Sequence, residues 1–347
     1  MENGALKDFI QATIKQLGLN LRGKTVLTEA ANGPYSVTPL IAGMAGAAVI
    51  AYGQTTAYGK VTDVFAELED RIRACSITGC RLVEKLAPED IGQADIITNS
   101  GHLRPLDEEK LKYIKTGAVI SLMYEAWELR ETDIDLAYCR TRKISVGGLN
   151  ERHPAVGVFE SLGDMAAELI TRSGLALRGE KLVLMCNNEF GPYIAKTLLA
   201  KGVELGVLAV PTHRERYPEE ATWLMNDPGQ AQDESFRTAK GLLFTAYPFD
   251  QKWISEYGPY PVSYFQEHFP DAKILRFAGD IDTGALDEAG IPYYPPEVKS
   301  GHMGILPSDV GYEPVIRLQA GGLRVGQAML EEEFDVNGQH IGSLVAL

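Results

Sequence analysis

The chain has little cysteine, a deficit of basic residues and no long apolar run. Its four cysteines (Cys75, Cys80, Cys139 and Cys186) match no zinc-binding spacing, and a chain of 347 residues does not need a disulfide scaffold. A formal net charge of −14 argues against nucleic acid as a partner, because phosphate neutralisation requires a basic face. The apolar stretches are too short to span a membrane, and the N-terminus lacks the pattern of a signal peptide. We therefore expect a cytoplasmic protein that binds neither nucleic acid nor a membrane.

The sequence does contain an internal repeat. Each copy has a Leu-Arg-Gly triplet, then a short apolar run, then a Gly-Pro-Tyr triplet and a helical pattern. The copies read Leu21-Arg22-Gly23, Thr25-Val26-Leu27 and Gly33-Pro34-Tyr35, then Leu177-Arg178-Gly179, Leu182-Val183-Leu184 and Gly191-Pro192-Tyr193. A buried strand, a glycine turn and a helix N-terminus together form a cradle for a phosphate or carboxylate, because free N–H groups and the helix dipole face the anion.

Strand and helix patterns alternate along both halves, which predicts parallel sheets covered on both faces. A chain of this length exceeds one ordinary core, so two domains are expected. The predicted fold class is α/β, with two Rossmann-like parallel-sheet domains and an interdomain cleft. We expect a substrate domain over residues 1–175 that recovers the C-terminal helix and tail at 313–347, and a dinucleotide-binding domain over 176–312. A homodimer is expected, since dimers are common for this architecture.

Several segments in order resemble the D-isomer 2-hydroxyacid dehydrogenase superfamily, which includes formate and glycerate dehydrogenases. They are Glu131-Thr132-Asp133-Ile134-Asp135-Leu136, Arg140-Thr141-Arg142-Lys143-Ile144-Ser145-Val146, Leu177-Arg178-Gly179-Glu180-Lys181-Leu182 and His302-Met303-Gly304. The resemblance implies an NAD(P)-dependent oxidoreductase acting on a small 2-oxo, 2-hydroxy or amino acid. It makes His302 the acid/base, since imidazole titrates near neutrality, and suggests Arg276 and Glu297 as its catalytic partners.

The glycine fingerprint of that superfamily is incomplete in this chain. Glycine is expected at 186, 188 and 191, but the chain has Cys186, Asn188 and Gly191, so only the glycine for close helix–strand packing remains. This departure leaves two other functions open. One is lyase, hydrolase or ligase chemistry on an anionic metabolite, and the other is a non-catalytic binding protein derived from a dehydrogenase.

Cofactor contacts are expected after the first two strands of the second half. Asn187 and Asn188 would present amides to an anion, and Gly191, Pro192 and Tyr193 begin the helix. Arg214 and Arg216 stand where an arginine accommodates the 2′-phosphate of NADP, although a surface turn with Arg–Glu pairing explains them equally well. The cofactor is therefore NADP or NAD.

Substrate contacts are expected at strand ends of the first half, where open parallel sheets bind ligands. His102, Tyr124 and Glu125 follow predicted strands, and Arg152 is able to hold the carboxylate of a small anionic metabolite bidentately. Each has a structural alternative. His102 and His302 suit loop turns, Tyr124 and Glu125 suit a helix start, and the segment around Arg152 suits a helix cap.

Overall fold

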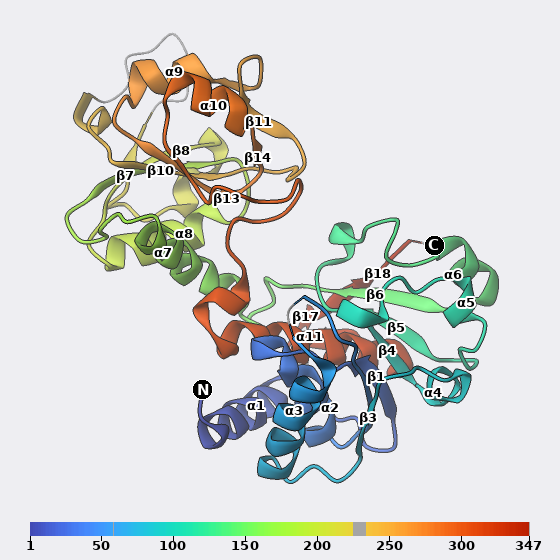
Figure 1. Ribbon diagram of the computed structural model, residues 1–347. Coiled ribbons are helices and arrows are strands. Elements are labelled where there is room, and N and C mark those ends of the chain that lie inside the picture. Colours follow the sequence, from blue (N-terminus) through green and yellow to red (C-terminus); the bar gives the residue numbers. More distant parts are fainter. Residues whose placement is uncertain (58, 225–233, 347) are drawn as a thin grey trace. The chain divides into compact units, whose positions relative to one another are not determined.

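The computed structural model describes residues 1–57, 59–224 and 234–346, and the chain divides into two units (Figure 1). The first unit is Met1–Val158 with Gly311–Leu347, and the second is Phe159–Val310. The first boundary lies before helix α7 (Leu162–Arg172), whereas the sequence placed it near residue 175. The reason is that the apolar side of α7, including Met165 and Leu169, is part of the core of the second unit.

The first unit contains a seven-stranded sheet with the order β18-β6-β5-β4-β1-β2-β3. The strands pair in parallel, except that β18 is antiparallel to β6. In chain order, the six parallel strands have the doubly wound order 3-2-1-4-5-6, in which the direction of winding reverses between β1 and β4. The strands are β1 (Thr25–Glu29), β2 (Ala48–Tyr52), β3 (Cys80–Val83), β4 (Ile96–Asn99), β5 (Val119–Leu122), β6 (Ser145–Leu149) and β18 (Gly342–Leu344).

Helices cover both faces of this sheet, because neighbouring residues of each strand are buried on opposite sides. Val26 and Ile96 face a core with α1, α2, α3 and α11, whereas Leu27 and Ile97 face a core with α4, α5 and α6. The helices are α1 (Asn3–Leu17), α2 (Val37–Met44), α3 (Val61–Ala74), α4 (Pro88–Gln93), α5 (Glu108–Leu111), α6 (Leu136–Arg142) and α11 (Tyr312–Glu331). Short 3-10 turns are η1 (Gly33–Ser36), η2 (Gly101–Leu103) and η3 (Ala126–Glu128), and the hairpin β16 (Asp335–Val336) and β17 (Gln339–His340) follows α11.

The second unit contains a six-stranded parallel sheet with the order β15-β13-β10-β7-β8-β9. This is the same doubly wound order, with its reversal between β7 and β10. The strands are β7 (Lys181–Cys186), β8 (Glu204–Ala209), β9 (Thr222–Trp223), β10 (Gly241–Thr245), β13 (Lys273–Ala278) and β15 (Tyr293–Tyr294). A small sheet of β11 (Lys252–Ser255), β12 (Tyr260–Pro261) and β14 (Asp280–Ile281) also belongs to this unit.

The helices of the second unit also cover two faces of its sheet. α7 and α8 pack on one face with Leu182 and Leu184, and α9 and α10 pack on the other with Val183 and Met185. These helices are α8 (Gly191–Ala200), α9 (Val262–His268) and α10 (Thr283–Ala289), and the 3-10 turns are η4 (Phe159–Ser161), η5 (Pro211–Arg216), η6 (Glu234–Phe236) and η7 (Pro307–Val310).

The predicted fold class, α/β with two Rossmann-like parallel-sheet domains, is confirmed by these two sheets. The interdomain cleft stays a prediction, as does the homodimer. Within the described ranges, no helix is both long and apolar enough to cross a membrane.

Candidate functional site

A cavity of about 310 Å³ lies at the point in the first unit where the direction of winding reverses. Its walls come from the segments that follow β1, β2 and β4, which lie side by side in the sheet (Figure 1). Open α/β sheets bind ligands beyond the carboxyl ends of their strands at this reversal. The described lining residues are Glu29, Ala30, Ala31, Asn32, Tyr35, Gln54, Thr56, Gly59, Val64, Gly101 and His102.

Glu29 is the buried carboxyl group of this cavity. It is the last residue of β1, is 7% exposed, and accepts a hydrogen bond from the backbone N–H of His102 at 3.3 Å. Burial raises the pKa of Glu29, while the charge of Arg104 and the His102 N–H oppose this shift. A Cβ at Gly101 would lie 1.5 Å from Oε2 of Glu29, and Gly101 has φ +33°. Position 101 therefore needs glycine for the carboxyl group to lie where it does.

His102 lies beside Glu29 in the same wall. Its Nδ1 is 3.5 Å from Nε2 of Gln54, and its ring meets the ring of Tyr52 edge-on at 6.4 Å. Partial burial lowers the pKa of His102, so the neutral imidazole predominates at pH 7 and is able to accept a proton. The cavity thus contains an acid and a base on adjacent elements.

A second polar cluster follows the neighbouring strands β4 and β5. The Tyr124 hydroxyl accepts a hydrogen bond from Nδ2 of Asn99 and donates to Oδ2 of Asp133 at 3.2 Å. The same oxygen of Asp133 pairs with Arg104 at 3.3 Å. Burial and Asp133 raise the pKa of Tyr124, so its hydroxyl keeps its proton. Asn99 is 1% exposed, and its Oδ1 has no hydrogen-bond partner among the described residues.

A group of carboxyls lies at the ends of β5 and β6. Glu125 accepts hydrogen bonds from the indole of Trp127 and from the backbone N–H of Glu151, at 3.2 Å for the latter. Nε of Arg152 lies 3.9 Å from Oε1 of Glu125. Burial and the charge of Glu125 raise the pKa of Glu128 to about 7, and burial with the charges of Glu128 and Glu125 raises the pKa of Glu151. In the parts of the chain that the structure describes, no cluster of this kind is arranged to hold a metal ion.

All four predicted substrate residues therefore lie at the carboxyl edge of the first sheet. His102 lines the cavity, Tyr124 belongs to the second cluster, and Glu125 and Arg152 meet at the third. Their roles in substrate binding stay predictions. The sequence reading missed Glu29, Gln54 and Asn99. Glu29 carried a usable signal, since it is a carboxylic acid that ends an apolar strand directly before the Asn32-Gly33 turn.

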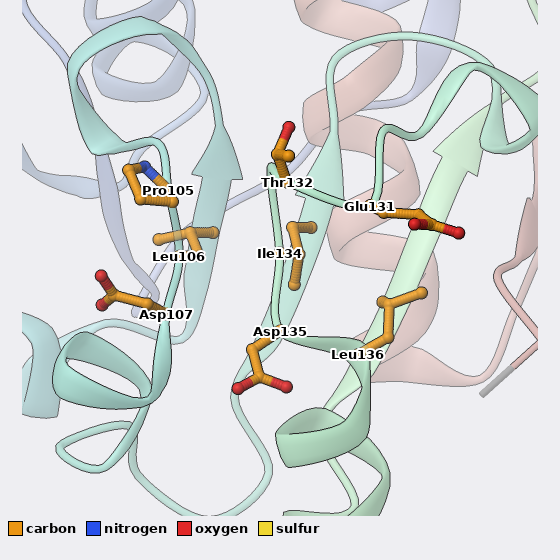
Figure 2. A pocket seen from close by; sticks show the side chains of 8 residues that line it. All are labelled: Pro105, Leu106, Asp107, Glu131, Thr132, Ile134, Asp135 and Leu136. Carbon is orange, nitrogen blue, oxygen red and sulfur yellow. The ribbon is translucent and has the colours of Figure 1, made fainter.

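A shallower groove of about 450 Å³ lies beside the same edge, between the segment before α5 and the segment before α6. Figure 2 shows the carboxylates of Asp107 and Asp135 on the two sides of this groove. Each carboxylate caps a helix, because Asp107 accepts from the N–H of Lys110 and Asp135 from the N–H of Tyr138. Helix capping accounts for these two acids.

In the second unit, the predicted cofactor loop is tied to the neighbouring strand end. The Asn187 side chain accepts from the N–H of Tyr247 at 2.8 Å and donates to its carbonyl at 3.0 Å. Nδ2 of Asn188 donates to the Thr245 hydroxyl at 3.1 Å, and its Oδ1 accepts from the N–H of Phe190 at 3.0 Å. Both asparagines therefore bridge from β7 to β10 across the point where the winding reverses.

The other predicted cofactor residues also have partners within the unit. Glu189 forms a two-pronged ion pair with Arg216, and Arg214 lies 6.0 Å over the ring of Trp223. Gly191 faces the hydroxyl of Tyr217, where an added Cβ would lie 1.9 Å from that oxygen. Pro192 and Tyr193 form the first turn of α8, as expected. A dinucleotide bound at this loop would therefore have to displace the contacts that these side chains make within the unit.

The three predicted catalytic residues belong to one loop system of the second unit. Arg276 on β13 is 4% exposed, pairs with Asp280, and donates to the carbonyls of Val298 and Lys299 at 3.3 Å. The carboxylate of Asp280 also accepts from the hydroxyl of Ser300 and from the N–H of Gly301. His302 is half-buried, with Nδ1 3.0 Å from the Ser300 carbonyl, and Glu297 is exposed. The Arg276 contacts are those of a residue that fixes the loop, and the catalytic roles remain predictions.

Comparison with known proteins supports the fold. No family model matches the chain, and no curated protein matches it. A chain of dipicolinate synthase from Bacillus subtilis is 14% identical, with 91% of this chain and 99% of that chain covered and a TM-score of 0.60. The corresponding chain of dipicolinate synthase from Bacillus halodurans is 11% identical, with coverages of 89% and 99% and a TM-score of 0.56.

Dehydrogenases of the class that the sequence resembles are also among the matching structures. D-lactate dehydrogenase with NAD+ from Lactobacillus jensenii is 13% identical, with coverages of 91% and 99% and a TM-score of 0.49. Structures of D-isomer-specific 2-hydroxyacid dehydrogenases are thus among the matches, at low sequence identity. The chain shares the fold of the dipicolinate synthase chains, and its substrate does not follow from these structures.

Proposed function

We propose that the chain is an oxidoreductase that acts on a small 2-oxo, 2-hydroxy or amino acid bound in the cavity of the first unit. The observation that carries this proposal is the position of Glu29 and His102, side by side in a cavity where the sheet reverses its winding. Acid–base pairs in such cavities are typical of sites that move a proton to or from a bound metabolite. The cytoplasmic location is part of the same proposal.

The residues of the cavity have separate roles in this proposal. The neutral imidazole of His102 accepts a proton at Nδ1 from a substrate hydroxyl or ammonium group, which replaces the 3.5 Å contact from Nε2 of Gln54. Glu29 orients the same substrate group from the β1 side, since its carboxyl group is fixed by the His102 N–H and by the close approach of Gly101. The adjoining Tyr124, Glu125 and Arg152 extend the polar surface along the sheet edge.

An NAD(P)-dependent reaction is the first candidate, supported by the doubly wound second unit. In this candidate, NADP or NAD binds at the end of β7, against Asn187, Asn188 and Gly191. Arg214 and Arg216, which follow β8, favour NADP. Binding there requires the two asparagines to release Tyr247 and Thr245, and Arg216 to release Glu189. This requirement makes the candidate open to a direct test.

A second candidate is favoured by the same interactions. If the bridges of Asn187 and Asn188 persist, the second unit serves as a structural partner. The chain is then a non-redox enzyme or a binding protein for the same class of metabolite.

Titration of the purified protein with NADP and with NAD by calorimetry separates the two candidates. The first candidate predicts binding of at least one of them below millimolar concentration, and absence of binding leaves the second. His102→Ala tests the shared site, with the exposed His340→Ala as a matched control. Loss of turnover or metabolite binding is expected for His102→Ala alone, and equal behaviour of both variants would remove His102 from the proposal.

A further inference from the structure

We propose that the cavity of the first unit selects metabolites with a protonated primary amine, which pairs with the carboxylate of Glu29. This inference rests on the proposed function and narrows its substrate class to amino compounds. Three features of the cavity carry it: the charge of its lining, the hydrogen-bond partners of Glu29, and the arrangement of the acceptors around Glu29.

The described lining of the cavity contains a carboxyl group but no lysine or arginine. A ligand that placed its own carboxylate against Glu29 would meet like charge at low dielectric, which disfavours binding. The guanidinium that acts on Glu29 is that of Arg104, and Arg104 is already paired with Asp133 at 3.3 Å. A cationic group of the ligand therefore suits this wall better than an anionic one.

Glu29 is contacted by fewer hydrogen-bond donors than a buried carboxylate normally requires. Among the described contacts it accepts one hydrogen bond, from the His102 N–H at 3.3 Å, and it takes part in no ion pair within 4 Å. An ionised carboxylate accepts about four hydrogen bonds when it is fully satisfied. Glu29 lies in the cavity wall. An ammonium group of a ligand, with three N–H donors and a positive charge, is therefore able to supply the hydrogen bonds and the ion pair that the protein does not provide.

The neighbouring acceptors complete the arrangement. His102 lies beside Glu29, and the Oε1 of Gln54 lies 3.5 Å from the hydroxyl of Tyr52, the last residue of the neighbouring strand β2. An ammonium group against Glu29 thus has two further acceptors, the Oε1 of Gln54 and the Nδ1 of His102, and at Nδ1 it would replace the 3.5 Å contact from Nε2 of Gln54. A carbonyl oxygen would need donors instead, and a hydroxyl group would supply only one.

The groups that act on Glu29 also predict a proton signature. The charge of Arg104 and the backbone N–H of His102 act on it, both from the segment after β4. Because burial raises the pKa of Glu29, the free protein holds a proton on this carboxyl group over a wider pH range. An ammonium ligand stabilises the ionised carboxylate, so binding releases that proton at pH values low enough for the free protein to hold it.

The test uses sets of matched ligands: each proteinogenic amino acid with its 2-oxo and 2-hydroxy analogue. Binding to the full chain is measured by calorimetry in two buffers of different ionisation enthalpy. We expect at least one amino acid to bind more tightly than both analogues, with release of a proton. Glu29→Gln is expected to weaken that amino acid about 30-fold while changing its analogues little, since the variant removes one member of a charge pair.

Glu131→Gln, an exposed acid of the same unit, is the matched control and is expected to leave all affinities unchanged. Glu29→Asp, which keeps the charge, is expected to retain the preference for the amine if Glu29→Gln disturbs folding. Tighter binding of the 2-oxo or 2-hydroxy acids would overturn this inference and leave the proposed function in place. Failure of the whole panel to bind would overturn both.

Discussion

The loop after β1 in the first unit and the loop after β7 in the second stand at the same place in the same strand order. After β1, a Cβ at Gly33 would meet nothing within 4 Å, and the residues around it line a cavity. After β7, a Cβ at Gly191 would lie 1.9 Å from the hydroxyl of Tyr217. Asn188 also caps the N–H of Phe190 in the second loop. One topology therefore gives an open cradle in one unit and a filled cradle in the other, according to the side chains beside it.

A Ser-Gly-His tripeptide occurs in each unit, as Ser100-Gly101-His102 and as Ser300-Gly301-His302, and it shows the same contrast. In both copies the glycine has positive φ, and the segment donates a backbone N–H to a buried carboxylate. In the second unit that carboxylate is Asp280, which is paired with the buried Arg276. In the first unit it is Glu29, which has no such ion pair among the described residues. A carboxylate paired inside the protein stabilises the loop, whereas one without a paired charge is available to a ligand.

The largest expected effect is on stability, from the two carboxylates. Asp280→Asn leaves the buried guanidinium of Arg276 without its ion pair, which costs about 3–5 kcal/mol in the free energy of unfolding. Glu29→Gln removes no ion pair, so a change of about 1 kcal/mol or less is expected. Urea denaturation followed by tryptophan fluorescence measures both. Equal losses for the two variants would show that the carboxylates do not differ in role.

The two glycines give the next effect. Gly101→Ala places a Cβ 1.5 Å from Oε2 of Glu29, so the carboxyl group must move and ligand affinity at the cavity is expected to fall about 100-fold. Gly301→Ala meets only Cβ of Asp250, at 3.6 Å, and is strained by its φ of +71° alone. It is expected to cost about 1–2 kcal/mol in stability without loss of affinity. Calorimetric titration of both variants decides between a positioning role of Gly101 and a turn requirement shared by both.

Much of the fold was predictable because its signals are local. Apolar strands such as Val119–Leu122 and capped helices alternate along the chain, and this alternation indicates parallel sheets. The start of α8 at Gly191-Pro192 was also readable, since proline is favoured in the first turn. The boundary between the two units before α7 was not readable from the sequence, because the packing of α7 on the second sheet depends on contacts between residues far apart in sequence.

The site was predictable only in part for the same physical reason. His102 was recognisable from its place after a strand, but its neighbours Glu29 and Gln54 come from two other strand ends. Arg276 attracted a catalytic role because it lies on a late strand, and only the structure shows its contacts with Asp280 and two loop carbonyls. Position along the chain identifies the sheet edge, whereas the partner of a charge depends on tertiary contacts.

The contrast between the two loops predicts a smaller effect on nucleotide affinity. Asn188→Gly removes the side chain that caps the N–H of Phe190 and restores the glycine that lets a pyrophosphate approach. NADP is expected to bind about tenfold more tightly than to the wild type, because one donor and some volume are released. Asn32→Gly in the first unit is the control, with no change expected. Unchanged NADP affinity of Asn188→Gly would indicate that other residues close the second loop.

The smallest effect concerns pH and the carboxyl group of Glu128 at the end of β5. Its pKa is about 7 in the folded chain against an ordinary value of 4.5, because of burial and the charge of Glu125. Between these two values the unfolded chain has released the proton while the folded chain still holds it. Because of this group, the free energy of unfolding falls as pH rises from 4.5 to 7, by at most ~1.4 kcal/mol per pH unit. Above pH 7 the group causes no further fall. Glu128→Gln is expected to flatten this part of the pH–stability curve, whereas the exposed Glu131→Gln is expected to leave it unchanged. A curve that stays steep in Glu128→Gln would assign the fall to Glu151 or Glu29, whose carboxyl groups are shifted in the same direction by burial in the same unit.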